Sequence, residues 1–167
     1  MGILPLQAMH GEAQMDDSYS AELERLGDEQ INDDEVARRH IRCGRVCDIA
    51  VAGGLQSATD YYYAALVLMH GVSVDEFATA LYFARTAAHR GEDRAWSIVA
   101  ACWDRWLIAK GRPQRFGTQF VRLNHIWTVE PIETDVSDAE RAFYGVPPLW
   151  VQRKSAALLQ RRSKDEQ

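Results

Sequence analysis

Apolar residues recur at helical spacing through the middle of the chain, in segments that glycines separate. One segment, residues 61–69, carries no charge on any side, which is typical of a helix that other helices surround. The next two segments each have one apolar face, with positions three or four residues apart. These positions are Phe77, Ala80, Leu81, Ala84 and Ala88 in the second segment, and Trp96, Val99, Trp103 and Trp106 in the third. Because the links between the segments are short, they predict antiparallel helical hairpins.

Serines that precede an acid by three residues mark where helices begin. In such a capping box the two side chains bind free N–H groups at the first helical turn. Three pairs have this spacing: Ser57 with Asp60, Ser73 with Glu76, and Ser137 with Glu140. Glycines beyond the last apolar positions predict the helix ends, at Gly53, Gly71, Gly91, Gly111 and Gly145.

A further helix precedes these hairpins, and a loop follows them. The helix begins near Asp33 or Asp34, either of which can cap it, and ends at Gly53. The polar residues 111–119 include Pro113, so they predict an ordered loop rather than a helix or a strand.

The last third of the chain predicts a small β-hairpin and two helices. Residues 120–123 and 126–129 have β-favouring side chains, and an Asn-His pair separates them. A short helix then ends at Gly145, and an amphipathic helix closes the chain. The predicted fold is therefore mainly α, with antiparallel helical hairpins, a short β-like segment and a C-terminal helix.

The N-terminal part of the chain is strongly acidic. Residues 12–35 contain ten acids and a single base, Arg25, with few large apolar side chains. Such a composition is typical of a segment that cannot bury enough apolar surface to fold. Residues 1–30 are therefore expected to form a loosely ordered arm, with a short helix near residues 20–26.

Residues 31–160 are expected to form a single helical domain, and residues 161–167 a polar tail.

The C-terminal end of the chain is basic. Bases near the C-terminus could attract the acidic arm, within one chain or between copies, although most acidic arms are simply solvated. These bases are Arg153, Lys154, Arg161, Arg162 and Lys164.

Length and composition argue against several classes of protein. The chain has 167 residues, enough for one domain with a core, and its net charge of −5 argues against a general binder of nucleic acid or anionic membranes. No apolar run approaches the ~18–20 residues of a membrane span, and the first residues lack the basic start of a secretory signal. Leu6 stands where myristoylated chains carry Ser or Thr. Three cysteines are too few for a disulfide framework and favour a reducing, cytoplasmic location.

Polar residues inside the third predicted helix are the clearest sign of a site. Asp104 and Arg105 are adjacent among aromatic and aliphatic residues. Because adjacent helical residues point about 100° apart, each of the two charges needs a partner elsewhere. The nearest polar side chains belong to the following loop: Arg112, Gln114, Arg115, Thr118 and Gln119. Asp104 either fastens this loop as a structural clamp or forms the wall of a site as a general base.

His70 is the second candidate for acid–base chemistry. It ends the uncharged helix, where the negative end of the helix dipole favours an imidazolium. It is either a C-terminal cap or a catalytic partner of Asp104.

Residues 66–149 resemble a bacterial family of unknown function. Its members carry a histidine at the end of an apolar helix, an Asp-Arg pair and a G-x-P-Q-x-Y-G-T-Q loop, which read here as LVLMHG, WDRW and GRPQRFGTQ. The tail of the family corresponds to PIETDVSDAERAFYGVPPL, which includes Arg141. Phe116 replaces the tyrosine of the loop, and Met69 replaces a glutamine, so roles that need those polar groups are missing here. The resemblance implies no reaction, but it implies that polar side chains are the signature of the family.

The small residues between 60 and 111 also resemble the helical hairpins of Sel1-like and tetratricopeptide repeats. The likeness covers about one and a half repeats. Fewer than three repeats are not stable alone, so flanking helices are expected to close the core.

Other chemistries have weaker support. Cys43 and Cys47 lie one helical turn apart, but no nearby Cys/His pair completes a metal site, and Cys102 is expected in the core. No glycine-rich phosphate loop, dinucleotide motif or strong metal-binding spacing occurs. We therefore expect neither a metal nor an organic cofactor. The set that could still hold a metal is His70, His89 and Asp104.

Two functions fit these observations. The first is a small cytoplasmic enzyme with hydrolase- or cyclase-like acid–base chemistry on a polar or peptide-like substrate, as in a biosynthetic pathway. In it, His70 and Asp104 are catalytic, and the other candidates bind the substrate: Arg105, Gln114, Arg115, Thr118 and Gln119. The alternative is a non-catalytic helical adaptor for a protein or peptide partner, and either could be a homodimer. An enzyme needs the polar groups to converge in an open pocket, whereas an adaptor needs them buried together, with an apolar groove elsewhere.

Overall fold

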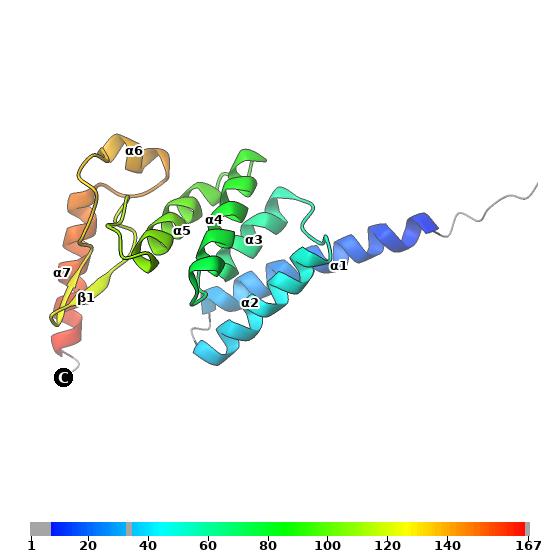
Figure 1. The fold of residues 1–167 in the computed structure, drawn as a ribbon, viewed down its shortest axis with the longest axis horizontal. Coiled ribbons are helices and arrows are strands. Elements are labelled where there is room, and N and C mark those ends of the chain that lie inside the picture. The colour runs from blue at the N-terminus through cyan, green and yellow to red at the C-terminus, as the bar shows by residue number, and fades with distance from the viewer. Residues whose placement is uncertain (1–7, 33–34, 166–167) are drawn as a thin grey trace, which may run out of the picture.

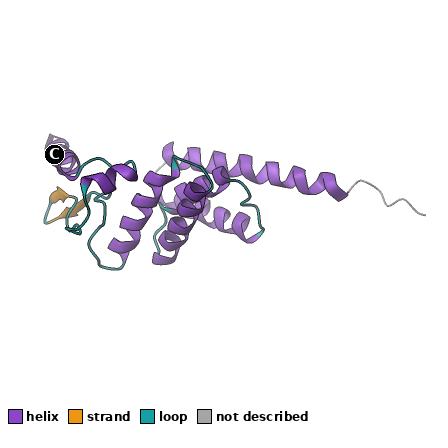
Figure 2. Cartoon of the chain, turned by 90° about the horizontal axis from the view of Figure 1, so that it is seen from above, coloured by secondary structure: helices purple, strands orange, loops and turns teal. Residues whose placement is uncertain are grey.

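The computed structural model describes residues 8–32 and 35–165. Seven helices and one two-stranded sheet form within these residues (Figure 1). They are α1 (Ala8–Asn32), α2 (Val36–Val51), α3 (Ala58–Leu68), α4 (Val74–His89), α5 (Ala95–Ala109), β1 (Val121–Leu123), β2 (Ile126–Thr128), α6 (Asp138–Phe143) and α7 (Leu149–Asp165). The molecule is elongated: α1 projects from one end, and α7 and the hairpin lie at the other (Figure 1, Figure 2).

The helix α3, which contains most of the uncharged segment 61–69, is the centre of the helical part, as predicted. Residues 63–69 are all buried, and α1, α2, α4 and α5 pack around α3. Alanines without any exposed surface, such as Ala64 on α3 and Ala84 on α4, let the helix axes approach closely. The mainly α architecture of antiparallel hairpins is confirmed, while kinship with the repeat families stays a prediction.

Local signals correctly predicted where α3, α4 and α6 begin. The predicted caps of α2, Asp33 and Asp34, lie outside the described residues, and Glu35 is the N-cap of α2 without a capping hydrogen bond to its side chain. Ser57 and Ser73 each accept a hydrogen bond from the backbone N–H three residues on, and the acid there binds back in a capping box. The side chain of Ser137 caps α6 by accepting a hydrogen bond from the backbone N–H of Glu140. Gly111 and Gly145 have positive φ, at 68° and 66°, so the chain leaves these helices in a conformation that glycine adopts without strain.

The acidic N-terminal segment is not the loosely ordered arm that its composition predicted. It forms α1, and Leu23 and Leu26 of this helix are buried in the core. A methyl group added at Gly27 would overlap Cδ1 of Tyr63, which shows how closely α1 approaches α3. The predicted boundary at residue 30 is therefore wrong, because the buried residues share one helix face and the acids lie around it. Residues 1–7 of the predicted arm lie outside the described residues.

Polar contacts hold α1 to α2. Arg45 donates two hydrogen bonds to the carboxylate of Glu22, at 2.9 and 2.8 Å. Arg42, which is buried, donates from Nε to the side-chain oxygen of Gln30 at 2.9 Å. These contacts join residues that are far apart in sequence, and composition does not reveal them.

The C-terminal part contains the predicted hairpin. β1 and β2 pair in antiparallel register, and Asn124 and His125 both have positive φ, as in the tight turns that join two strands. The backbone N–H of Trp127 donates to the side-chain oxygen of Gln160, which ties the hairpin to α7. α7 extends to Asp165, so most of the predicted polar tail is helical. None of the helices in the described residues is long and apolar enough to cross a membrane.

Candidate functional site

Asp104 fastens the 111–119 loop to α5. Its side chain has no exposed surface, and its two oxygens accept four hydrogen bonds. Oδ1 accepts from the backbone N–H groups of Arg115 and Phe116, at 2.7 and 2.9 Å. Oδ2 accepts from the backbone N–H and the hydroxyl of Thr118, both at 2.8 Å. The loop therefore folds back onto Asp104, as expected, and encloses the carboxylate completely.

This arrangement decides between the two interpretations of Asp104. A buried carboxylate is costly unless donors surround it, and here four donors do so. A general base needs room for a substrate proton within hydrogen-bond reach, and no surface of Asp104 is open to one. Its predicted catalytic role is therefore not supported, and the structural clamp describes it.

Gln114 and Gln119 also form hydrogen bonds within the loop. Gln114 is buried, and its amide nitrogen donates to the carbonyls of Gln119 and Val129, at 2.9 and 2.8 Å. Its oxygen accepts from the backbone N–H of Gln119. The side chain of Gln119 donates to the hydroxyl of Thr118. The polar signature of the loop is thus a set of internal hydrogen bonds.

Arg115 is held by two acids. Its guanidinium donates to Glu133 at 2.9 Å and to Glu140 at 2.8 Å, and it lies over the ring of Trp103. The hydrogen bond to Glu140, followed by the one to Glu133, raises the pKa of Arg115. Arg115 is therefore not available as the predicted anchor for an anionic substrate. Arg105 lies half-buried one residue after Asp104 on α5.

Two side chains that were not among the predicted site residues complete the clamp. The carbonyl of Phe116 accepts from Nε of Arg141 at 3.0 Å and from the amide of Gln152 at 2.9 Å. Arg141 is almost fully buried and also donates to the carbonyl of Val136. Arg141 is part of the sequence motif that resembles the bacterial family. No pattern in the sequence indicated Gln152, because Gln152 and Phe116 are 36 residues apart along the chain.

Phe116 packs inside this polar frame. Its ring has no exposed surface and lies 4.7 Å from the ring of Tyr144 and 5.9 Å from that of Trp103, measured between centroids. With Val136 and Val146 it forms a second, smaller core. This core joins α5 to the C-terminal part of the chain.

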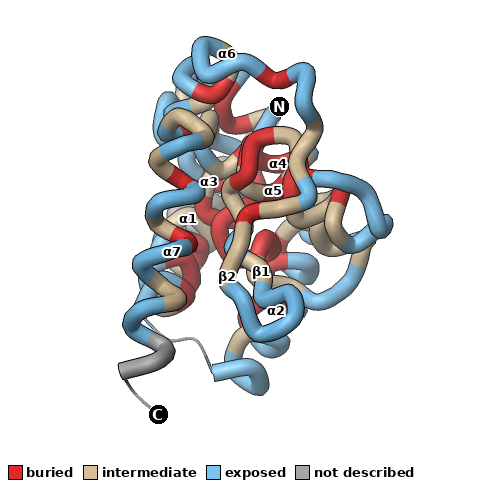
Figure 3. Tube along the Cα trace, turned by 90° about the vertical axis from the view of Figure 1, so that its left-hand side faces the viewer, coloured by how far each residue is buried: buried red, intermediate tan, exposed pale blue. Residues whose placement is uncertain are grey.

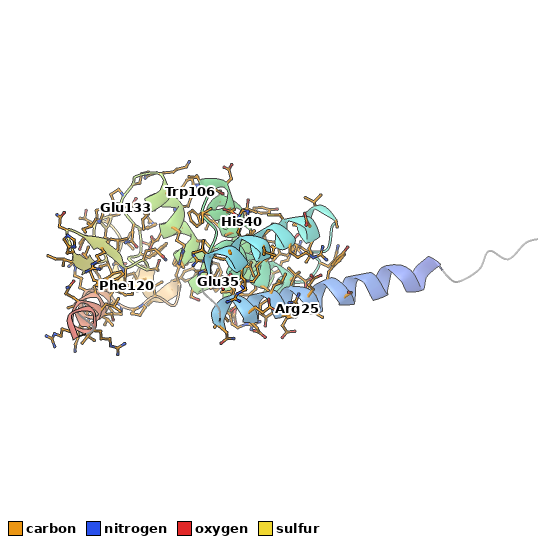
Figure 4. All side chains as sticks on the ribbon, turned by 90° about the horizontal axis from the view of Figure 1, so that it is seen from below. Arg25, Glu35, His40, Trp106, Phe120 and Glu133 are labelled. Carbon is orange, nitrogen blue, oxygen red and sulfur yellow. The ribbon has the colours of Figure 1, made fainter. Side chains whose placement is uncertain are left out.

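His70 does not meet Asp104. It is half-buried at the end of α3 and lines a cavity of about 200 Å³, together with His40 and Cys43 of α2 and Glu76 of α4. No residue of the 111–119 loop lines this cavity. In Figure 4, His40 and Glu133, the partner of Arg115, lie apart along the molecule. The predicted His70–Asp104 site is therefore not assembled, because α3 ends beside α2, whereas the loop packs on α5 and α6.

His70, His89 and Asp104, which the sequence left as a possible metal-binding set, do not form a metal site either. The ring of His89 packs edge-on against Trp96, with centroids 5.5 Å apart. Within residues 8–32 and 35–165, no group of three or more His, Cys, Asp or Glu side chains has a geometry that could hold a metal ion.

The three cysteines differ in accessibility. Burial raises the pKa of Cys43 to about 11 and that of Cys102 to about 12. Partial desolvation also raises the pKa of Cys47, but this residue is exposed to solvent. At pH 8 only about one Cys102 thiol in ten thousand is then a thiolate, the reactive form.

Thiol alkylation at pH 8 is therefore expected to modify Cys47 rapidly in the native protein, and Cys43 and Cys102 only after unfolding. Mass spectrometry of the alkylated protein, with and without guanidinium, measures this difference. A Cys47→Ser control should lose the fast reaction. Rapid native alkylation of Cys102 would contradict the buried position of this residue.

A groove runs along the outer face of α4. Its volume is about 620 Å³, and its lining is mostly apolar. We call it the α4 groove, and it is lined by Ala78, Leu81, Tyr82, Arg85, Thr86, His89, Arg90 and Trp106. Tyr82 is 64% exposed, and the ammonium group of Lys110 lies 4.3 Å from the centroid of the Trp106 ring. The sequence did not predict the groove. Leu81 and Trp106 were assigned to the apolar faces of two helices, and the other lining residues formed no pattern that indicated a binding surface.

The chain matches no protein-family model, no curated protein and no solved structure. The resemblance carried by GRPQRFGTQ therefore stays a prediction.

Proposed function

We propose that this protein is a non-catalytic helical adaptor, and that its α4 groove binds an acidic, amphipathic segment of a partner protein. The observation that carries the proposal is the groove itself, an apolar surface with a basic rim. Clefts of this size with apolar linings and a few placed polar groups are typical binding sites.

The state of the polar loop favours an adaptor over an enzyme. Asp104 is enclosed by four hydrogen bonds, and Gln114 and Arg115 are bound to other groups of the chain. His70, the other predicted catalytic residue, lines a separate cavity. Groups buried against one another, with an apolar groove elsewhere, are the arrangement that an adaptor requires.

The chemistry of the groove specifies the kind of partner. Leu81, Tyr82 and Trp106 offer apolar surface to an aliphatic or aromatic side chain. Arg85 is exposed and makes no hydrogen bond or ion pair in the described part of the chain. Since no acid lines the groove, its rim attracts carboxylates. An amphipathic helix with acids beside its apolar face fits both features.

Selection from a library of displayed random peptides tests this proposal. Peptides that bind the wild-type protein should contain an aromatic or aliphatic residue close to Asp or Glu. Tyr82→Ser and Arg85→Glu should each weaken their binding by about tenfold or more, which corresponds to about 1.4 kcal/mol. The affinity of a selected peptide for each variant, measured by fluorescence anisotropy, gives the result.

Arg122→Glu provides a matched control, because Arg122 is also an exposed arginine but lies on β1, outside the groove. It should change the affinity less than twofold, which is about 0.4 kcal/mol. Peptides that bind wild type, Tyr82→Ser and Arg85→Glu equally well, or a selection that enriches none, would refute the proposal.

A further inference from the structure

α7 presents an unpartnered basic face at one end of the molecule. Trp150, Lys154, Ala157 and Arg161 follow one another at helical spacing, so they share a face. Trp150 is 64% exposed, and Lys154, Arg161 and Arg162 are exposed too. Figure 3 views the molecule from this end, and parts of the α7 trace are coloured there as exposed.

Three of the bases on or beside this face have no acidic partner in the described part of the chain. Lys154, Arg161 and Arg162 have no ion pair or hydrogen bond from their side chains in the described residues, whereas Arg153 pairs with Glu130. The sequence of α7 carries five bases and one acid. A large exposed tryptophan beside unpaired cations is typical of an interaction surface.

α1 carries the complementary charge at the opposite end. Its sequence contains seven acids and one base. The N-terminal half of α1 extends beyond the helices that cover the rest of it (Figure 1, Figure 2). At 1.5 Å per residue, α1 is about 37 Å long and α7 about 25 Å long, so a projecting half of α1 can lie along much of α7.

The elongated shape decides which α1 can reach α7. Within one chain the two helices lie at opposite ends, so they cannot pair with each other (Figure 1). We propose that the acidic, projecting half of α1 from one copy docks on the basic face of α7 of a second copy. Such head-to-tail contacts are heterologous, so they build chains or rings rather than a symmetric dimer. The proposal is independent of the α4 groove.

Sedimentation of the full chain tests whether it associates. The weight-average mass should rise with protein concentration at about 0.05 M salt, and the association should weaken by about tenfold or more at about 1 M salt, where the screening length falls to about 3 Å. A wild-type chain that stays monomeric at the highest concentration measured overturns the proposal.

Two variants, each defective at one end, test the head-to-tail geometry. Asp16→Asn/Asp17→Asn removes charge from α1, and Lys154→Gln/Arg161→Gln removes charge from α7. Lys154 and Arg161 are exposed, and circular dichroism verifies that each variant is folded. Each variant alone should be monomeric where the wild type associates. Their mixture should form a one-to-one complex and nothing larger, because it retains one intact α1 and one intact α7.

The remaining outcomes separate this contact from its competitors. Arg85→Gln should leave the association unchanged, whereas its loss in that variant would place α1 in the α4 groove and overturn the proposal. A mixture of the two defective variants that stays monomeric would also overturn it. Binding of a monomeric wild type to vesicles of anionic lipid, abolished by Lys154→Gln/Arg161→Gln, would assign the face to membranes instead.

Discussion

Asp104→Asn is expected to lower the free energy of unfolding by about 3–5 kcal/mol. The carboxylate of Asp104 is fully buried and accepts four hydrogen bonds from the loop. Asparagine has the same shape but offers one acceptor oxygen, and its NH₂ group would face N–H donors. Some of those donors would then be buried without an acceptor, which is the costly case. Urea denaturation measures the loss, and the melting temperature should fall by about 10 °C.

Asp135→Asn is the matched control for this substitution. Asp135 is exposed, so the same change of charge should cost less than about 0.5 kcal/mol. Hydrogen exchange adds a local measurement: in Asp104→Asn the backbone amides of Arg115, Phe116 and Thr118 should lose protection before the helices do. Unchanged stability and protection would mean that Asp104 is not the clamp.

Leu23→Ala is expected to destabilise the protein by about 2–4 kcal/mol. Leu23 has no exposed surface and packs in the core formed with α3, although it lies in the most acidic stretch of the chain. Truncation removes buried apolar surface and leaves a cavity, because α1 is held in place by Glu22 and Gln30. Denaturation in urea again provides the measurement.

Ile31→Ala tests the same kind of truncation on the same helix. Ile31 is 66% exposed, so its removal should cost less than about 0.5 kcal/mol. Equal and small effects of Leu23→Ala and Ile31→Ala would mean that the N-terminal segment is a solvated arm after all.

Helix boundaries were predictable because their causes are local. Ser57 and Ser73 bind the backbone three residues away, and Gly111 adopts a positive φ that other residues disfavour. Such interactions depend on neighbours in sequence alone. The hairpin turn at Asn124 follows the same rule.

The loop around Asp104 was predictable for a different reason. A charge inside an apolar helix needs donors, and the nearest donors in sequence belonged to residues 111–119. The sequence could not show that donors from Thr118 and from the backbone of Phe116 would occupy both oxygens of the carboxylate. That outcome decides between a clamp and a catalytic base.

Two predictions were wrong because they depended on which residues lie close together in space, and not on which residues are neighbours in the sequence. His70 was paired with Asp104 on chemical grounds, but it lines a cavity with α2 instead. The acids of α1 dominated its composition, while Leu23 and Leu26 on one face were enough to hold it in the core.

The amino-acid sequence by itself determined where α3, α4 and α6 begin, where the helices from α2 to α6 end, that α3 would be central, and that residues 111–119 would fold onto Asp104. These features depend on hydrophobic periodicity, on capping and on the cost of an unpaired buried charge, which operate over short separations along the chain. Only the tertiary structure decided that α1 belongs to the core, that His70 and Asp104 stay apart, and that Arg141 and Gln152 support the loop. Those outcomes depend on which distant surfaces pack together, and the packing of the whole chain sets this choice.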